Sequence, residues 1–380
     1  MLCETGNFFR YLIMPRFVLI ALLLITSLLF ADLIAAQERG RGTISGTVTA
    51  EKTGEPLHGA HVFLSGTKIG TVTNPAGRFQ IRGIPAGNYR LVISSIGYKR
   101  LAEDLTISPG ENLIRNEKLP AVVYELDEIF AGNLDERWQT YLERFERLFL
   151  GETQLSDSVK ILNPEVLRFD RSRWGRFRAE ALAPLRIENR ALGYEITYFL
   201  DDFSHSGTVT RWDGEPLFAE MIPDNEQQAA WWEENRRNAF LGSYRHFLIS
   251  LVEGSTEEEE FRVYLERRGR SLASTQQKVR VDGTRITEPA PEEFLTRLRF
   301  NGVLEVIYLG AGEDPDYIRW RRGTVRMPRD VQSSHVELNK PFVTIDADGE
   351  ISETYGTTRY GYFSFKRFAD KTPREYRPGN

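Results

Sequence analysis

The chain has 380 residues, a net charge of −5 and one cysteine, Cys3. The negative net charge argues against nucleic acid as a partner, because phosphate binding requires a basic surface. A single cysteine excludes an internal disulfide and every zinc site that needs several thiolates.

The first 36 residues have the pattern of a signal peptide. Arg16 precedes an apolar run at 17–30, and small residues up to Ala36 follow it. The run is shorter than the ~20 residues of a membrane-spanning helix. We therefore expect cleavage after Ala36, with an uncleaved anchor as the alternative and Met14 as a second plausible start. This predicts an exported protein of a Gram-negative envelope, periplasmic or associated with the outer membrane.

Residues 43–118 predict an all-β domain. Turn residues separate seven short, mostly alternating runs, as in a small closed sandwich. The runs are 43–50, 60–66, 69–73, 77–84, 88–97, 99–107 and 112–119.

The segment "TNPAGRFQIRGIPAGNYRL", 73–91, indicates which sandwich this is. The matching positions are Gly46, Val48, Pro56 through Ala60, Gly70, Thr71, Thr73, Gly77, Phe79, Ile81, Pro85, Gly87, Tyr89, Gly97 and Tyr98. In order and spacing they resemble the carboxypeptidase regulatory-like domain, a transthyretin-like (prealbumin-like) β-sandwich. The resemblance implies an accessory module of a larger protein.

Two functions of proteins that carry this module are excluded by the rest of the chain. None of the five histidines has a Glu three residues later, so the His-x-x-Glu pair of the zinc carboxypeptidases is missing. The remaining residues are too few for the plug and barrel of an outer-membrane receptor.

Residues 119–133 predict a linker, and residues 134–380 an α+β domain with antiparallel sheet. Helical spacing follows Asp135, the expected cap, and a second, long helix is expected at about 225–252. Three Asp-Gly pairs, at 213–214, 282–283 and 348–349, predict hairpin turns.

The second region also resembles an uncharacterised domain that follows the regulatory-like module in many Bacteroidetes envelope proteins. The segments that carry this likeness are 161–169, 183–200, 242–251 and 361–376. No reaction follows from the resemblance.

Two short motifs resemble reactive sites but favour turns. Ser65-x-x-Lys68 matches the nucleophile motif of penicillin-binding enzymes, which requires a helix start, whereas here it lies between strands. Asp346-x-Asp348-Gly349 resembles a calcium loop with the glycine two positions early, so a hairpin turn explains it without metal.

The histidines give no clear metal site, and no motif indicates a cofactor. His58 and His61 are three residues apart and face opposite sides of a strand. His335-x-Glu337 matches the start of a deaminase site that also needs two cysteines. The acidic run 257–260 predicts a solvated loop before a strand.

One polar cluster is retained as a candidate site. The stripe on the predicted helix comprises Trp232, Arg236, Phe240, Ser243 and Phe247, with His246 at its edge. An arginine and a serine in an aromatic stripe need polar partners, because burying them unpaired costs ~1–3 kcal/mol or more. Arg236, Ser243 and His246 therefore either form a structural network, which we favour, or face a cleft.

Two functional classes follow. The first is a non-catalytic envelope scaffold or binding protein that docks on an outer-membrane receptor, a surface glycan or another envelope protein. The alternative is an envelope hydrolase with an unrecognised site in 134–380. The absence of a recognisable metal, nucleophile or phosphate motif favours the first class, although paired carboxylates need no sequence motif.

The segment between the two regions, "LPAVVYELDEIFAGN", has no cleanly apolar face and predicts a connector or edge strand. We therefore expect residues 43–118 to fold alone. The second region should tolerate their removal, with little burial between the two.

Overall fold

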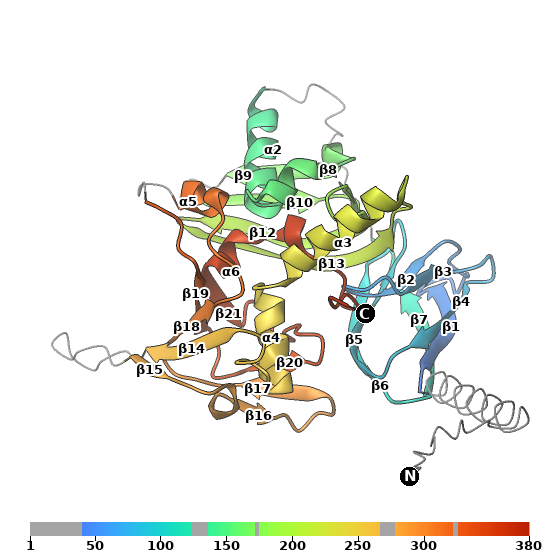
Figure 1. Ribbon diagram of the computed structural model, residues 1–380. Helices are drawn as coiled ribbons and strands as arrows, with labels where there is room; N and C mark the ends of the chain where they lie inside the picture. Colours follow the sequence, from blue (N-terminus) through green and yellow to red (C-terminus); the bar gives the residue numbers. More distant parts are fainter. Residues whose placement is uncertain (1–39, 123–135, 172–174, 267–277, 322–325, 380) are drawn as a thin grey trace, which may run out of the picture.

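The computed structural model of the protein describes residues 40–122, 136–171, 175–266, 278–321 and 326–379 (Figure 1). The predicted signal peptide, the cap at Asp135 and most of the linker lie outside these residues. None of the described helices has both the length and the apolar character needed to cross a membrane.

The N-terminal region is a two-sheet sandwich of seven strands, as predicted. The strands are β1 (Gly42–Ala50), β2 (His61–Leu64), β3 (Gly70–Val72), β4 (Arg78–Ile84), β5 (Gly87–Ser94), β6 (Leu101–Ile107) and β7 (Asn112–Leu119). One sheet has the order β4-β1-β7 and the other β3-β2-β5-β6. Strand β7 is parallel to β1, and the other pairs are antiparallel. The two inner faces form one apolar core.

The β3–β4 turn shows why this sequence folds as a hairpin. The Asn74 side chain accepts hydrogen bonds from the backbone N–H groups of Ala76 and Arg78, both at 3.0 Å. Gly77 has φ +68°, and a Cβ there would lie 2.5 Å from the carbonyl oxygen of Val48. The turn directs Phe79 and Ile81 into the core.

A six-stranded antiparallel sheet begins the second region. Its strands are β8 (Val159–Ile161), β9 (Leu167–Arg171), β10 (Phe177–Ala181), β11 (Leu185–Asn189), β12 (Tyr194–Ser206) and β13 (Val209–Glu220). The order is β8-β11-β12-β10-β9, with β13 paired to β12. Helix α2 (Glu136–Phe149) covers this sheet, and its Phe145 and Phe149 pack on the rings of Phe203 and Tyr198.

The segment 225–252, predicted as one helix, forms two helices, α3 (Glu226–Phe240) and α4 (Tyr244–Glu253). The prediction of one continuous side-chain stripe along a single helix is therefore wrong. Gly242 has φ +65°, and a Cβ there would lie 2.6 Å from the Tyr308 ring. The Ser243 hydroxyl then caps α4 by accepting from the N–H of His246. Gly242, in the left-handed backbone conformation, thus follows the end of α3, and Ser243 caps the start of α4.

Two further sheets complete the second region. The first has the order β15-β14-β18-β19-β21 and the second β16-β17-β20. Their strands are β14 (Phe261–Glu266), β15 (Lys278–Arg280), β16 (Thr287–Pro289), β17 (Leu295–Leu298), β18 (Val303–Tyr308), β19 (Gln332–Leu338), β20 (Val343–Asp346) and β21 (Thr357–Gly361). Helices α5 (Pro315–Trp320) and α6 (Tyr362–Phe365) and the 3₁₀ helix η4 (Phe368–Asp370) complete the region. The region is therefore α+β with antiparallel sheets, as predicted.

Only one of the three Asp-Gly pairs forms a hairpin turn. Gly349, with φ +76°, lies in a turn after β20 that is closed by the Ile345–Ile351 bridge. Asp213-Gly214 instead lies inside β13, opposite a register shift in β12. Asp282-Gly283 begins the 3₁₀ helix η3 (Gly283–Arg285). The dipeptide signals turns locally, but pairing with a long neighbouring strand overrides it at 213–214.

The expectation of little burial between the two regions is wrong. The outer face of the β3-β2-β5-β6 sheet packs against β12 and β13 through Phe63, Val92, Phe199 and Leu217. Phe63 and Val92 are fully buried and Phe199 is 4% exposed. The rings of Phe63 and Phe199 stack at 5.3 Å. That residues 43–118 fold alone stays a prediction.

Candidate functional site

The turn at 65–68 joins the sandwich to the second region. The Gly66 N–H donates to the Pro216 carbonyl (2.7 Å), and the Phe218 N–H donates to the Thr67 carbonyl (3.0 Å). Lys68 forms an ion pair with Glu220 at 2.6 Å. Ser65 and Lys68 thus lie in a turn, as expected, and this turn is part of the interface.

The C-terminal segment after η4 closes the interface from the other side. The Arg374 N–H donates to the Gly66 carbonyl (2.8 Å), and a Glu375 carboxylate oxygen accepts from the Lys68 N–H (2.8 Å). The Arg245 guanidinium of α4 donates to the carbonyls of Pro373, Arg374 and Tyr376. Three separate parts of the chain are therefore fixed at one junction.

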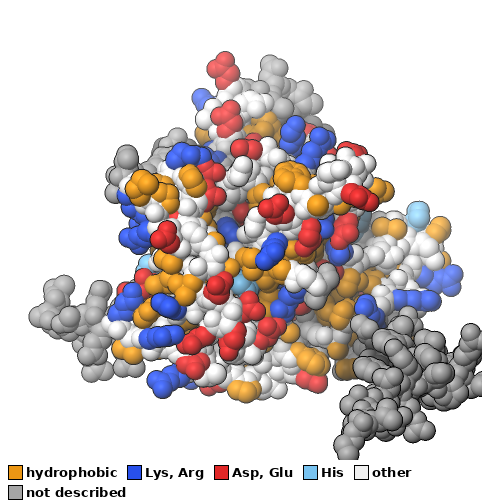
Figure 2. All heavy atoms as spheres, viewed as in Figure 1, with side chains coloured by type: hydrophobic (Ala, Val, Ile, Leu, Met, Phe, Trp, Pro, Cys, Tyr) orange, Lys and Arg blue, Asp and Glu red, His pale blue; other side chains and the backbone are white. Residues whose placement is uncertain are grey.

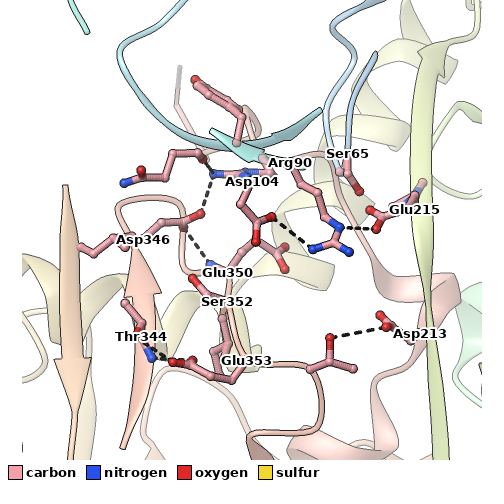
Figure 3. Close-up of a pocket in the computed structure, with 18 of the residues that line it drawn as sticks. Ser65, Arg90, Asp104, Asp213, Glu215, Thr344, Asp346, Glu350, Ser352 and Glu353 are labelled. Carbon is pink, nitrogen blue, oxygen red and sulfur yellow. Dashed lines mark hydrogen bonds and ion pairs between the residues drawn. The ribbon is translucent and has the colours of Figure 1, made fainter. Parts of the chain in front are cut away.

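A cleft of about 690 Å³ opens at this junction. The turn at 65–66 and strands β5 and β6 of the sandwich form one wall. Strand β13 forms the second wall, and β17, β20 and the segment 350–354 form the third. Figure 3 shows charged side chains of all three walls around this space. Clefts of this size between packed units are common ligand sites.

Carboxylates outnumber cations in the cleft lining. The carboxylates are Asp104, Asp213, Glu215, Glu292, Asp346, Glu350 and Glu353, and the cations are Arg90, Arg297, Lys371 and Arg374. On the face of the molecule shown in Figure 2, by contrast, acidic and basic side chains are interspersed. The cleft is thus a local concentration of negative charge.

Arg90 holds the sandwich wall against β13. Its Nε donates to the carboxylate of Glu215 at 2.6 Å, and its Nη1 contacts Asp104 at 3.1 Å (Figure 3). Glu215 is buried, with 5% of its surface exposed. The pKa of Arg90 is raised because these two carboxylates outweigh burial, which alone would lower it. Arg90 is therefore already paired with carboxylates of the protein at the interface.

Arg374 links the floor of the cleft to the sandwich. Its Nη2 donates to Asp346 (2.6 Å), Asp348 (3.1 Å) and the Asn88 carbonyl (2.9 Å). Its guanidinium also lies 5.1 Å from the centre of the Tyr89 ring. Burial raises the pKa of Asp346 to about 6, although Arg374 pulls it down. The carboxylates of Asp346 and Asp348 thus share Arg374 as their cationic partner.

In the described part of the chain no cluster of metal-binding side chains occurs.

Three carboxylates of the lining form no ion pair with a cation among the described residues: Asp213, Glu292 and Glu353. Both oxygens of Glu353 accept from Thr344, one from its N–H and one from its hydroxyl. Asp213 accepts from the Gly214 N–H and the Thr354 hydroxyl. These donors are neutral, so negative charge remains on two walls of the cleft.

The structure separates the predicted polar cluster into two networks. Arg236 donates to the Leu192 carbonyl (2.7 Å) and lies 4.2 Å from the centre of the Tyr194 ring. Ser243 caps α4 through His246. His246 is buried, accepts from the Gly242 N–H at Nδ1 and contacts Glu259 through Nε2 at 2.9 Å. These contacts assign the proton of the neutral ring to Nε2.

The burial of His246 leads us to predict that the free energy of unfolding depends on pH. Burial lowers the pKa of His246, more than Glu259 raises it. The unfolded chain therefore binds more protons just below the ordinary histidine pKa, and stability is lost as the pH falls through this range. Between about pH 7.5 and about pH 5, the wild type should lose more free energy of unfolding than His246→Gln. Urea titrations of both proteins test the difference; equal losses would contradict it.

Three other histidines and the acidic run 257–260 lie in strands and turns of the fold. His58 Nδ1 contacts the Thr73 carbonyl at 3.2 Å, and His61 begins β2. His335 lies within β19, together with Glu337. Residues 257–260 form an exposed turn before β14, as predicted.

Comparison with known families supports the sandwich. Residues 44–130 match the family model of the CarboxypepD_reg-like domain. The N-terminal unit is therefore a carboxypeptidase regulatory-like domain, as predicted. No curated protein matches the chain.

Several solved structures are weakly similar. Catechol 1,2-dioxygenase from an Acinetobacter species is 13% identical over 26% of this chain and 57% of its own, with a TM-score of 0.19. A pilus backbone protein of group B streptococcus is 18% identical over 23% and 43%, with a TM-score of 0.19. A putative carbohydrate binding protein from Bacteroides uniformis is 11% identical over 47% and 79%, with a TM-score of 0.18. The chain thus spans less than two thirds of that dioxygenase, and such TM-scores support no statement about function.

The interface and the cleft have sequence signals of different strength. Strands β2 and β5 contain the continuous apolar runs Val62–Leu64 and Leu91–Ile93, which indicate burial on both faces. The cleft itself has no local signal, because its walls come from segments as far apart as residues 65 and 374.

Proposed function

We propose that this is a non-catalytic binding protein of the cell envelope, exported and cleaved after Ala36. It docks on another envelope component through the cleft between the regulatory-like domain and the second region. The observation that carries this proposal is the shared cleft, walled by both regions and richer in carboxylates than in cations.

The state of the carboxylates favours binding over hydrolysis. A general acid or base must be free to exchange its proton with the substrate. Asp104 and Glu215 are paired with Arg90, and Asp346 is held by Arg374 and by the N–H groups of Asp348 and Glu350. Glu353 is held by Thr344 through both oxygens. Carboxylates fixed in this way are poor proton carriers.

The ligand that suits this cleft is a basic segment of an envelope protein. Asp213, Glu292 and Glu353 leave negative charge on the walls, and a lysine or arginine side chain can pair with it. Trp212 and Phe342 add aromatic surface to the same lining, on which cations are also favourable. An outer-membrane receptor or other envelope protein fits this better than a neutral surface glycan.

Fluorescence anisotropy with labelled peptides tests the proposal. A lysine-rich peptide should bind the full-length protein, and a glutamate-rich peptide of equal length should not. The substitutions Asp213→Asn and Glu292→Gln together should weaken binding about 10-fold or more, because each removes one charge contact. Equal binding of both peptides, or no effect of the two substitutions, would refute the proposal. Recovery of a cleaved peptide by mass spectrometry would favour the hydrolase.

A further inference from the structure

A second cavity, of about 330 Å³, lies beside the end of the β12–β13 hairpin. Residues 208–212 of the hairpin, residues 357–361 of β21, and α6 with the two residues that follow it form most of the lining. Among the residues that the structure describes, no carboxylate lines this cavity. Its charged residues are Arg211, Arg359, Lys366 and Arg367. In a protein of net charge −5, this is a local concentration of positive charge.

Two of the four cations are fixed in the protein. Lys366 Nζ donates to the carbonyls of Asn238, Ala239 and Leu241 at the end of α3. Arg367 donates to the Leu148 and Ser364 carbonyls. All these acceptors are neutral, so neither cation forms an ion pair through these hydrogen bonds. Burial lowers the pKa of Lys366 to about 8 and that of Arg367 to about 10, and it outweighs the carboxylates of Asp370, Asp314 and Glu152, which raise these values.

The other two cations are exposed and lie against aromatic rings. The Arg211 guanidinium lies 5.8 Å from the centre of the Tyr355 ring, and that of Arg359 lies 5.1 Å from the centre of the Tyr244 ring. Neither guanidinium makes a hydrogen bond or ion pair with another described residue. Stacking holds a guanidinium in place and leaves its donors available for a planar anion. Arg211 comes from β13 and Arg359 from β21, on two sides of the cavity.

The remaining lining is aromatic and hydroxylated. Trp212, Trp320 and Tyr360 contribute ring surface. Thr208 and Thr210 of the hairpin and Thr357 and Thr358 of β21 contribute hydroxyl groups. Aromatic faces pack against the apolar face of a sugar ring, and hydroxyl groups of protein and sugar can exchange hydrogen bonds. Paired guanidiniums bind carboxylate, sulfate or phosphate through parallel hydrogen bonds. The lining therefore combines what a sugar ring requires with what an anion requires.

We propose that this cavity binds an acidic saccharide, a sugar that carries a carboxylate, sulfate or phosphate group. Arg211 and Arg359 bind the anionic group, and the aromatic side chains contact the sugar ring. The cavity shares Trp212 with the acidic cleft, but the rest of its lining is separate, and it selects ligands of the opposite charge. The protein would thus hold a basic protein segment at one site and an acidic glycan at the other.

Titration calorimetry with the full-length protein tests this site. The probes are glucose 6-phosphate, glucuronic acid, glucose and inorganic phosphate. The two acidic sugars should bind, glucose should not, and phosphate should bind more weakly than glucose 6-phosphate. Arg211→Gln with Arg359→Gln should weaken acidic-sugar binding about 10–100-fold, because two charge-assisted contacts are lost.

The control variant is Arg78→Gln, which removes an exposed arginine of β4 and should bind like the wild type. Both substituted arginines of the test variant are exposed, so its thermal unfolding should be unchanged. Absence of acidic-sugar binding in the wild type, or equal binding in the double variant, would overturn the site. Phosphate binding as tight as that of glucose 6-phosphate would overturn its saccharide part.

Discussion

Replacing Arg374 by methionine is expected to lower the free energy of unfolding by about 3–5 kcal/mol at about pH 8. The substitution leaves Asp346, which is 7% exposed, as a buried carboxylate without its cation. It also removes the hydrogen bond to Asn88 that ties the tail to the sandwich. The penalty should shrink at about pH 5, because the pKa of Asp346, already about 6, rises further without Arg374 and the group becomes neutral.

Arg377→Met is the matched control from the same segment. Arg377 forms a partly exposed ion pair with Glu253 at 2.9 Å, and such pairs contribute about 0–1 kcal/mol. Urea titrations at both pH values measure the two effects. A loss below about 1 kcal/mol for Arg374→Met at both pH values would show that the buried pair does not hold the junction.

Replacing Phe199 by alanine should cost about 3–5 kcal/mol, as for other buried aromatic side chains. Phe199 lies in the second region, and its ring stacks on that of Phe63 of the sandwich, with the ring centres 5.3 Å apart. The substitution therefore opens a cavity between the two regions. Urea denaturation of the full chain measures the loss.

A double-mutant cycle assigns this loss to the interface. Phe63→Ala and Phe199→Ala together should cost less than the sum of the single substitutions, with a coupling of about 0.5–1.5 kcal/mol. Leu182→Ala, at a position 44% exposed, is the control and should change stability by about 0.5 kcal/mol or less. Strict additivity of the two phenylalanine substitutions would contradict a direct contact.

The sandwich could be predicted because its information is local. Asn74, Gly77 and Gly87 specify turns by side-chain hydrogen bonds or by backbone angles that other residues avoid. Phe79 and Ile81 alternate with exposed neighbours and so define the buried face. All seven predicted strands occur where the turn residues place them.

The break between α3 and α4 and the interface between the two regions each have a sequence signal, but its interpretation depends on the surrounding structure. Gly242-Ser243 is a helix end followed by a cap, and it outweighs the continuous aromatic periodicity on both sides. The apolar run Val62–Leu64 fits a strand buried on both faces. In a seven-stranded sandwich that pattern requires a second packing partner, which here is the β12–β13 hairpin.

The two cavities could not be predicted from the sequence. Arg90 and Glu215 are 125 residues apart and meet only because the sandwich packs on β13. Arg211 and Arg359 likewise share a cavity only because β13 and β21 come together. Neither pair has a characteristic spacing, and their chemistry arises from tertiary contacts alone.

We propose that the regulatory-like domain and the second region unfold as one unit, because the cleft that we propose as the binding site lies at their junction. Scanning calorimetry of the full-length protein tests this most directly, because contacts between the two regions, such as Phe63–Phe199 and Arg90–Glu215, must break before either region unfolds. We predict one cooperative transition, with the calorimetric enthalpy of unfolding equal to the van't Hoff enthalpy. Two independent transitions, with the sandwich melting unaffected by Phe199→Ala, would contradict the account.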